Sequence, residues 1–215
     1  MANSGNAENL DRQFQKVYNV TLDGSTVTVN ASLAGISRSP YFRYTAVYTV
    51  TADGKIAVTL DGKVKERAFH LPRLGFEVLL PKENTAFRYF GMGPHENYCD
   101  MHRASMVGWY DSTAEAEYVP YIVPQEHGNH TKTKVLELEN SLRFEAETEM
   151  EICVSQYTAH SLYRAMHWDE LEKSPFVTVR IDYKDSGVGS GSCGPLIDPK
   201  YCLTEKEIHF GFTIY

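Results

Sequence analysis

The side chains with the richest chemistry lie in two loop segments of this sequence. The first, Arg88–Asp100, reads Arg-Tyr-Phe-Gly-Met-Gly-Pro-His-Glu-Asn-Tyr-Cys-Asp, and the second, Tyr118–His130, is again aromatic, broken by proline and then polar. Glycine reaches backbone angles that other residues avoid and proline fixes its own φ, so Gly91 and Gly93-Pro94 predict a sharp exit from a strand. Polar groups placed on such an exit are typical of a recognition loop.

Three carboxylates in these loops, Glu96, Asp100 and Glu126, could serve glycoside hydrolysis. That reaction needs an acid and a base or nucleophile about 5–10 Å apart. Acidic residues in β-turns often accept hydrogen bonds from backbone amides instead. Sequence does not place the three in space. We predict that loops 95–100 and 125–129 are mainly architectural, and we assign no catalytic residue.

Metal binding is a second chemistry to weigh. The loop histidines are His95, His102, His127 and His130, and the cysteines are Cys99, Cys153, Cys193 and Cys202. No helical i, i+4 histidine pair and no Cys-x-x-Cys spacing is present, so we predict no metal site and no cofactor. Reduced thiols in a cytoplasmic protein are the simplest interpretation of the cysteines.

A third segment, Gly189–Gly194, formally matches the G-x-G-x-x-G pattern of dinucleotide-binding proteins. That pattern works only where a helix N-terminus then points at the pyrophosphate. Here Pro195 and Pro199 follow, which disfavours such a helix. The pattern therefore predicts a turning loop, which can border a binding site.

Four aromatic residues of the loops and adjoining strands have two possible roles. Packing in the core is one, and a platform for the apolar face of a sugar ring is the other. These residues are Tyr98, Trp109, Tyr118 and Tyr121.

The elements around these loops read as strands. Apolar residues alternate from Phe14 onward, and Asp-Gly pairs at 23–24, 53–54 and 61–62 predict tight hairpin turns between long antiparallel strands. Ser161–Lys173 is the one helical candidate, so the sequence predicts an all-β, antiparallel fold with one short helix. Residues 1–13 are expected to be disordered or tag-like, and residues 14–215 to form a single domain.

The net charge and the composition of the chain indicate which classes of binding partner are compatible with it. The 215 residues carry a net charge of −7 without a basic tract, which disfavours nucleic acid and anionic membranes. A neutral sugar fits better. The first residues lack the basic and apolar regions of a signal peptide, and no segment is long and apolar enough to span a membrane, so we expect a cytoplasmic protein.

Four motifs, in this order, resemble a known family. They are Leu71-Pro-Arg-Leu-Gly75, Phe90–Asp100, Tyr118–Asn129 and the segment from Asp182 to Pro195. Together they are similar to the C-terminal domain (domain 5, or small chain) of family-two β-galactosidases. The resemblance implies a β-supersandwich of the galactose-mutarotase-like class. It also implies a cytoplasmic bacterial enzyme that cleaves terminal β-galactosides such as lactose with retention.

The resemblance further implies that the chemistry lies elsewhere. The family's two catalytic glutamates sit in a (β/α)₈ barrel of about 200–250 residues, which is not in this sequence. The Arg-Ala-Pro-x-Asp-Asn-Asp motif expected near the front of domain 5 is also missing. The chain thus resembles the later part of that domain, and we expect it to be inactive alone, with the barrel domain as its partner.

In the family, the glycine-rich loop reaches over the sugar pocket. This implies that Ser190, Gly191, Ser192 and Cys193 bind substrate, namely a β-galactoside or galactose. Many relatives carry tryptophan where this sequence has Cys193, so an aromatic contact worth about 1–3 kcal/mol is replaced by a small thiol.

Other functions remain open. The chain could be a stand-alone carbohydrate-binding module, or a mutarotase-like hexose epimerase using Glu96 with His95 or His127 as base and acid. A structural piece that mediates contacts in a homo-oligomer is a third possibility.

Overall fold

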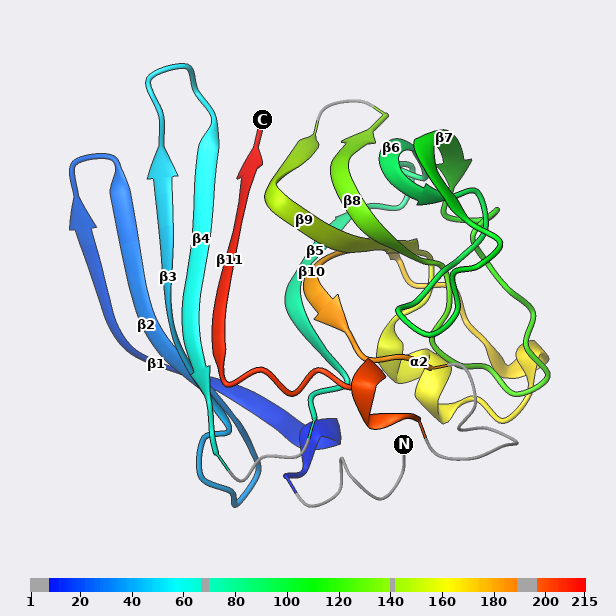
Figure 1. Cartoon of the computed structure of the whole chain (residues 1–215), viewed down its shortest axis with the longest axis horizontal. Helices are drawn as coiled ribbons and strands as arrows, with labels where there is room; N and C mark the ends of the chain where they lie inside the picture. Colours follow the sequence, from blue (N-terminus) through cyan, green and yellow to red (C-terminus); the bar gives the residue numbers. More distant parts are fainter. Residues whose placement is uncertain (1–7, 67–69, 140–141, 189–196) are drawn as a thin grey trace. The chain divides into compact units, whose positions relative to one another are not determined.

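The computed structural model describes residues 8–66, 70–139, 142–188 and 197–215 (Figure 1). The chain forms two compact units: Met1–Pro72 with Cys202–Tyr215, and Arg73–Tyr201. Strands dominate the described residues, and their pairings within each unit are antiparallel. The prediction of an antiparallel all-β fold with one short α-helix is therefore confirmed for the described part of the chain.

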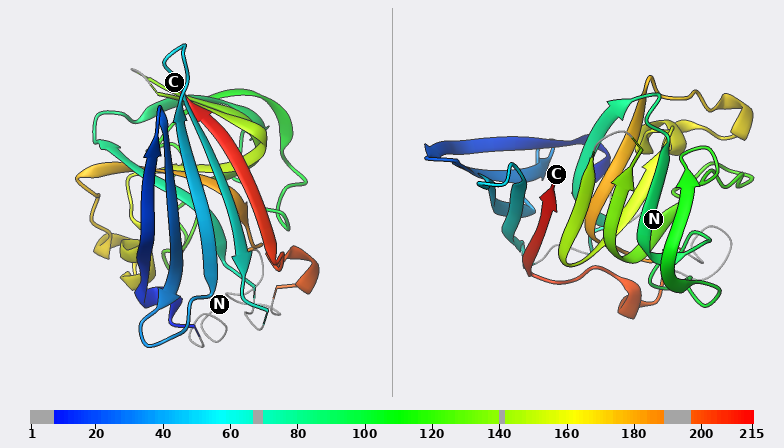
Figure 2. Two further views of the ribbon diagram at one scale, coloured as in Figure 1. Left: turned by 90° about the vertical axis from the view of Figure 1, so that its left-hand side faces the viewer. Right: turned by 90° about the horizontal axis from the view of Figure 1, so that it is seen from above.

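The first unit is a five-stranded meander in which β11 returns beside β4 (Figure 2, left). Its strands are β1 (Gln13–Asp23), β2 (Thr26–Gly35), β3 (Phe42–Val50), β4 (Ile56–Val64) and β11 (Glu207–Ile214). A 3₁₀ turn, η1 (Leu10–Arg12), precedes β1. Residues 8–12 are thus described, whereas 1–7 lie outside the described residues, so disorder at the start stays a prediction.

Two of the predicted hairpin turns are confirmed. Gly24 joins β1 to β2 with φ +55°, and Gly54 joins β3 to β4 with φ +82°. These positive angles are the reason that Asp-Gly pairs suit such turns. The turn predicted at Asp61-Gly62 is wrong, because both residues lie inside β4. Gly62 is needed there for close packing, since a Cβ would overlap the ring of Phe42.

One face of this sheet is apolar. Ala46, Leu60 and Phe210 lie directly opposite one another on β3, β4 and β11, and all three are buried. Val58 and Phe212 continue this row two residues further on. Because side chains alternate along a strand, the residues between them form a second, polar face.

The second unit is a six-stranded sheet with the order β5-β10-β9-β8-β6-β7 (Figure 1). Its strands are β5 (Arg73–Pro81), β6 (Ala86–Gly93), β7 (Met106–Thr113), β8 (Asn129–Leu138), β9 (Arg143–Ser155) and β10 (Phe176–Asp185). Tyr89, Leu136, Phe144, Ile152 and Val179 are almost fully buried in it. Loop 94–105 leaves this sheet after Gly93, as Gly93-Pro94 predicts, but the exit predicted at Gly91 is wrong, because Gly91 lies inside β6 and packs too closely on Thr133 for a Cβ. Loop 114–128 leaves the sheet at the end of β7.

The helix is shorter than its predicted range of 161–173. Helix α2 (Ala159–Arg164) is capped by Thr158, whose side chain accepts a hydrogen bond from the Ser161 amide. It ends because Ala165 is extended and the Met166 amide donates to the Glu170 carboxylate at 2.8 Å. Two further 3₁₀ turns are η2 (Trp168–Glu170) and η3 (Pro199–Tyr201).

Candidate functional site

A buried ion cluster occupies the second unit. We use this name for Arg73, Glu126, Glu151, Arg180, Asp182 and Asp185. Arg73, at the start of β5, contacts the Asp182 carboxylate and lies 3.6 Å from Asp185 Oδ2, both on the neighbouring strand β10. Gly75 makes room for this contact, because a Cβ there would clash with the Asp182 side chain. The motif Leu-Pro-Arg-Leu-Gly thus supplies one of the two arginines of the cluster and the space for its partner.

Glu126 links both arginines of this cluster. Its Oε1 lies 3.1 Å from Arg73 Nη1 and 3.7 Å from Arg180 Nη1. Burial alone would raise the pKa of Glu126, but the two guanidinium groups reverse this effect and hold that pKa below its usual value. Glu126 is therefore a locked carboxylate, which suits an architectural role better than proton transfer.

The other three carboxylates behave differently. Burial raises the pKa of Asp182 and of Asp185, although Arg73 acts in the opposite direction on both. Burial also raises the pKa of Glu151 to about 7, despite a 2.6 Å hydrogen bond from Asn129. Four carboxylates face only two guanidinium groups, so these charges do not offset burial at three of the four, and the pKa values of those three stay raised.

The two remaining loop carboxylates are also bonded inside the protein. Glu96 accepts hydrogen bonds from the Tyr121 hydroxyl and, at 2.8 Å, from the Gly128 amide. Asp100 accepts one from the Val188 amide at 3.2 Å. These contacts tie the first loop to the second and to the end of β10. They are the architectural contacts that the sequence predicts for loops 95–100 and 125–129.

The loop histidines make hydrogen bonds within the protein. His130 is buried, with Nε2 2.9 Å from Glu117 Oε2 and Nδ1 2.9 Å from the Tyr89 hydroxyl. Nδ1 of His127 lies 2.8 Å from the Gln125 carbonyl oxygen. Among the residues that the structure describes, no group of three or more histidine, cysteine or acidic side chains is arranged to hold a metal ion.

The four aromatic candidates separate into different environments. Tyr98 is 1% exposed and belongs to the core. Tyr118 packs edge-on against His127, and Tyr121 is bonded to Glu96. Trp109 is 45% exposed, but the Arg88 guanidinium lies 4.7 Å from its ring centre. Of the four, only Trp109 offers a half-open aromatic surface.

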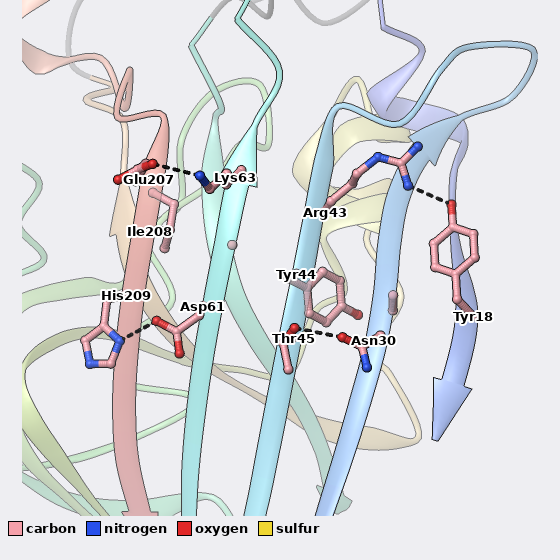
Figure 3. A pocket seen from close by; sticks show the side chains of 12 residues that line it. Tyr18, Asn30, Arg43, Tyr44, Thr45, Asp61, Lys63, Glu207, Ile208 and His209 are labelled. Atoms are coloured by element: carbon pink, nitrogen blue, oxygen red, sulfur yellow. Dashed lines mark hydrogen bonds and ion pairs between the residues drawn. The ribbon is translucent and has the colours of Figure 1, made fainter. Parts of the chain in front are cut away.

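A polar pocket of about 660 Å³ opens on the first unit (Figure 3). Four side-chain pairs line it. Asn30 with Thr45, Asp61 with His209, and Lys63 with Glu207 join neighbouring strands, whereas Tyr18 of β1 and Arg43 of β3 meet across β2. Figure 3 shows these pairs side by side across β1 to β4 and β11. This surface presents amide, hydroxyl, aromatic and charged groups, most of them paired with one another.

A smaller pocket of about 450 Å³ lies in the second unit. Tyr89, His95, Glu96, Tyr110 and Glu117 contribute to its lining. Both oxygens of Glu96 and both oxygens of Glu117 already accept hydrogen bonds from protein groups. This pocket therefore has few free polar groups for a ligand.

The predicted substrate-binding residues Ser190, Gly191, Ser192 and Cys193 lie outside the described residues. The chain on either side of them is described. The Gly187 amide donates to the Tyr201 carbonyl at 2.9 Å, and Cys99 Sγ lies 3.4 Å from the same oxygen. Segments 187–188 and 201 are thus fixed to each other and to the turn at 98–101.

Several residues of the site escaped sequence reasoning. Arg180 carries a recognisable signal, because a charged residue in the apolar run Val-Thr-Val-Arg-Ile predicts a buried ion pair. Glu117 carries none, since it closes an acidic turn that reads as solvent-exposed. Glu151 falls in a row with three other glutamates of β9, and only the other three are exposed.

These observations define an all-β protein with a buried ionic core and an open polar pocket. A family model described as the β-galactosidase small chain matches residues 3–214, and the chain belongs to this family. The resemblance stated from the four motifs is thereby confirmed. In the described residues, no helix is long and apolar enough to cross a membrane.

Three of the relatives that this chain matches are β-galactosidases. The protein from Actinobacillus pleuropneumoniae is 32% identical over 95% of this chain and 21% of its own length. That from Lactobacillus delbrueckii subsp. bulgaricus is 35% identical over 76% of this chain and 16% of its own length. The protein from Kluyveromyces lactis is 28% identical over 96% of this chain and 21% of its own length. The chain spans about a fifth or less of the length of these relatives.

Proposed function

We propose that this chain is a non-catalytic module of a retaining β-galactosidase that completes the sugar pocket of a catalytic barrel domain encoded outside these residues. One observation carries the proposal: the chain belongs to the small-chain family, yet matches only about a fifth of each relative. The internal bonding of Glu96, Asp100 and Glu126 supports it. Cytoplasmic location stays a prediction.

In this proposal, Ser190, Gly191, Ser192 and Cys193 contact the galactoside. Serine hydroxyls and backbone amides would hydrogen bond to sugar hydroxyls, and the Cys193 thiol would supply a small apolar surface. The buried ion cluster and Asp100 would hold the chain on both sides of this loop. The role of the module is then to position the loop, whereas bond cleavage belongs to the barrel.

The test starts with hydrolysis of nitrophenyl β-galactoside by the purified 215-residue chain. We expect no hydrolysis above buffer, and we expect activity when the chain is mixed with a separately produced remainder of the enzyme. The proposal would be overturned if the isolated chain hydrolysed this substrate and if Glu96→Gln or Glu126→Gln abolished that activity. Full activity of the remainder without this chain would overturn it too.

The polar pocket favours a second candidate function, a carbohydrate-binding module. Arg43 lines it without a carboxylate partner among the described residues, and Tyr18 beside it is 48% exposed. Titration of the chain with lactose, followed by NMR, tests this candidate. Chemical-shift changes that are confined to residues of the pocket and are absent in Arg43→Ala would support this candidate. No chemical-shift change on addition of lactose would rule it out.

The contacts of Glu96 and His127 disfavour a mutarotase-like epimerase. Both oxygens of Glu96 already accept hydrogen bonds from protein groups, which makes this carboxylate a weaker base, and His127 is 4% exposed. His95, the other acid of this alternative, lines the smaller pocket together with Glu96. Polarimetry of freshly dissolved galactose would show acceleration by the chain if this alternative were correct.

A further inference from the structure

Strand β1 has an open edge. It pairs with β2 on one side, and no other described strand of the first unit pairs with it. All eleven of its residues, Gln13–Asp23, are exposed. Backbone N–H and C=O groups along such an edge are a template for another strand.

The exposed side chains of β1 include an apolar row. Val17, Val20 and Leu22 are 49%, 57% and 73% exposed. They lie opposite Ala31, Val29 and Val27 of β2, which alternate along that strand and therefore share a face. One side of the open edge thus offers apolar surface over most of its length.

The opposite face of β1 carries two unmatched charges. Lys16 lies opposite Ser32 and Asp23 opposite Thr26, and these β2 residues are six positions apart, so both charges lie on one face. Neither charge has an ion-pair partner among the described residues; the Lys16 ammonium instead lies 5.2 Å from the Tyr18 ring centre. The two charges mark the two ends of an eight-residue segment.

We propose that β1 pairs antiparallel with β1 of a second copy of this chain, with Lys16 opposite Asp23 of the partner copy. A two-fold axis that creates this pair also creates its mirror, Asp23 opposite the partner copy's Lys16. The same register places Val17 opposite the partner copy's Leu22, again twice. Opposite charges and apolar pairs directly across two strands stabilise the pairing.

The register is consistent with the geometry of the strand. Residues that face each other across an antiparallel pair lie on the same side of the sheet, as Lys16 and Asp23 do, and as Val17 and Leu22 do. The irregularity of β1 falls between Val17 and Asn19, near the two-fold axis. Pairing is therefore expected in the two segments that flank it.

The experiment measures the mass of the 215-residue chain over a range of concentrations by analytical ultracentrifugation. We expect a monomer–dimer equilibrium. Lys16→Asp and Asp23→Lys each place two like-charged pairs across the interface and are expected to raise the dimer dissociation constant about tenfold. The double variant restores opposite charges and is expected to return to the original value.

Lys82→Asp is the matched control, because it makes the same charge change at an exposed site of the second unit. It should leave the equilibrium unchanged, and circular dichroism should show each variant folded. A monomer at every concentration overturns the inference, as does a dimer that the single swaps leave intact. Binding of β1 only to the remainder of a β-galactosidase overturns it too, whatever the outcome for the proposed function.

Discussion

The lack of a side chain at Gly75 allows the contact between Arg73 and Asp182. Gly75 lies opposite Asp182 in the β5–β10 pair, and a Cβ would clash with the carboxylate that Arg73 contacts. Gly75→Ala should therefore separate Arg73 from Asp182 and lower the free energy of unfolding by about 2–4 kcal/mol. Urea denaturation measures this loss.

Gly108→Ala is the control for Gly75→Ala. A Cβ at Gly108 would lie 3.3 Å from the Tyr110 hydroxyl, and a side-chain end can move aside, so a loss below about 1 kcal/mol is expected. If both variants lost the same free energy of unfolding, the effect of Gly75→Ala would not come from the contact between Arg73 and Asp182.

At the scale of the element, β9 and β10 bring together three carboxyl groups whose pKa values are raised by burial. The raised pKa values of Glu151, Asp182 and Asp185 mean that these carboxyl groups bind protons more tightly in the folded state. Their stabilising effect is complete below the unfolded pKa of about 4 and is lost as the pH rises through the folded pKa, about 7 for Glu151. Glu126, with a lowered pKa, acts oppositely and only at acid pH.

Stability should therefore fall between pH 5 and pH 8, by roughly 3 kcal/mol for Glu151 alone. Urea denaturation at pH 5, 6, 7 and 8 measures this change. Glu151→Gln, which keeps the shape and removes the titration of this group, should reduce the fall by the share of Glu151 and leave that of Asp182 and Asp185. A stability that rises steadily from pH 5 to pH 8 would contradict the assignment of protons to this cluster.

The elements also show what the sequence could and could not predict. Period-two patterns and the Asp-Gly turns at 23–24 and 53–54 predicted the strands, because both signals are local. The turn prediction at Asp61-Gly62 was wrong, because this glycine is needed for close packing against the Phe42 ring of the neighbouring strand and not for a turn. The ion cluster could not be predicted, because it depends on the pairing of β5 with β10, which are far apart in the sequence. Its one local signal is the arginine in the apolar run 177–181.

At the scale of the whole molecule, the loop positions of the second unit serve a protein larger than this chain, if the proposed function is correct. Asp100 accepts a hydrogen bond from Val188, and Gly187 packs so closely on its carboxylate that no Cβ fits. Asp100 is then a positioning residue for residues 190–193. Its contacts lie in described segments and do not depend on the conformation of that loop.

Asp100→Ala should raise KM for nitrophenyl β-galactoside about three- to tenfold in the enzyme reconstituted from this chain and its remainder, because a bond to a charged group is lost. Since Asp100 does not reach the barrel carboxylates in this proposal, kcat should change less than KM. Asp111→Ala removes an exposed carboxylate elsewhere in the second unit and should leave both constants unchanged. If Asp100→Ala lowered kcat alone, or if both variants behaved alike, Asp100 would not position a substrate loop.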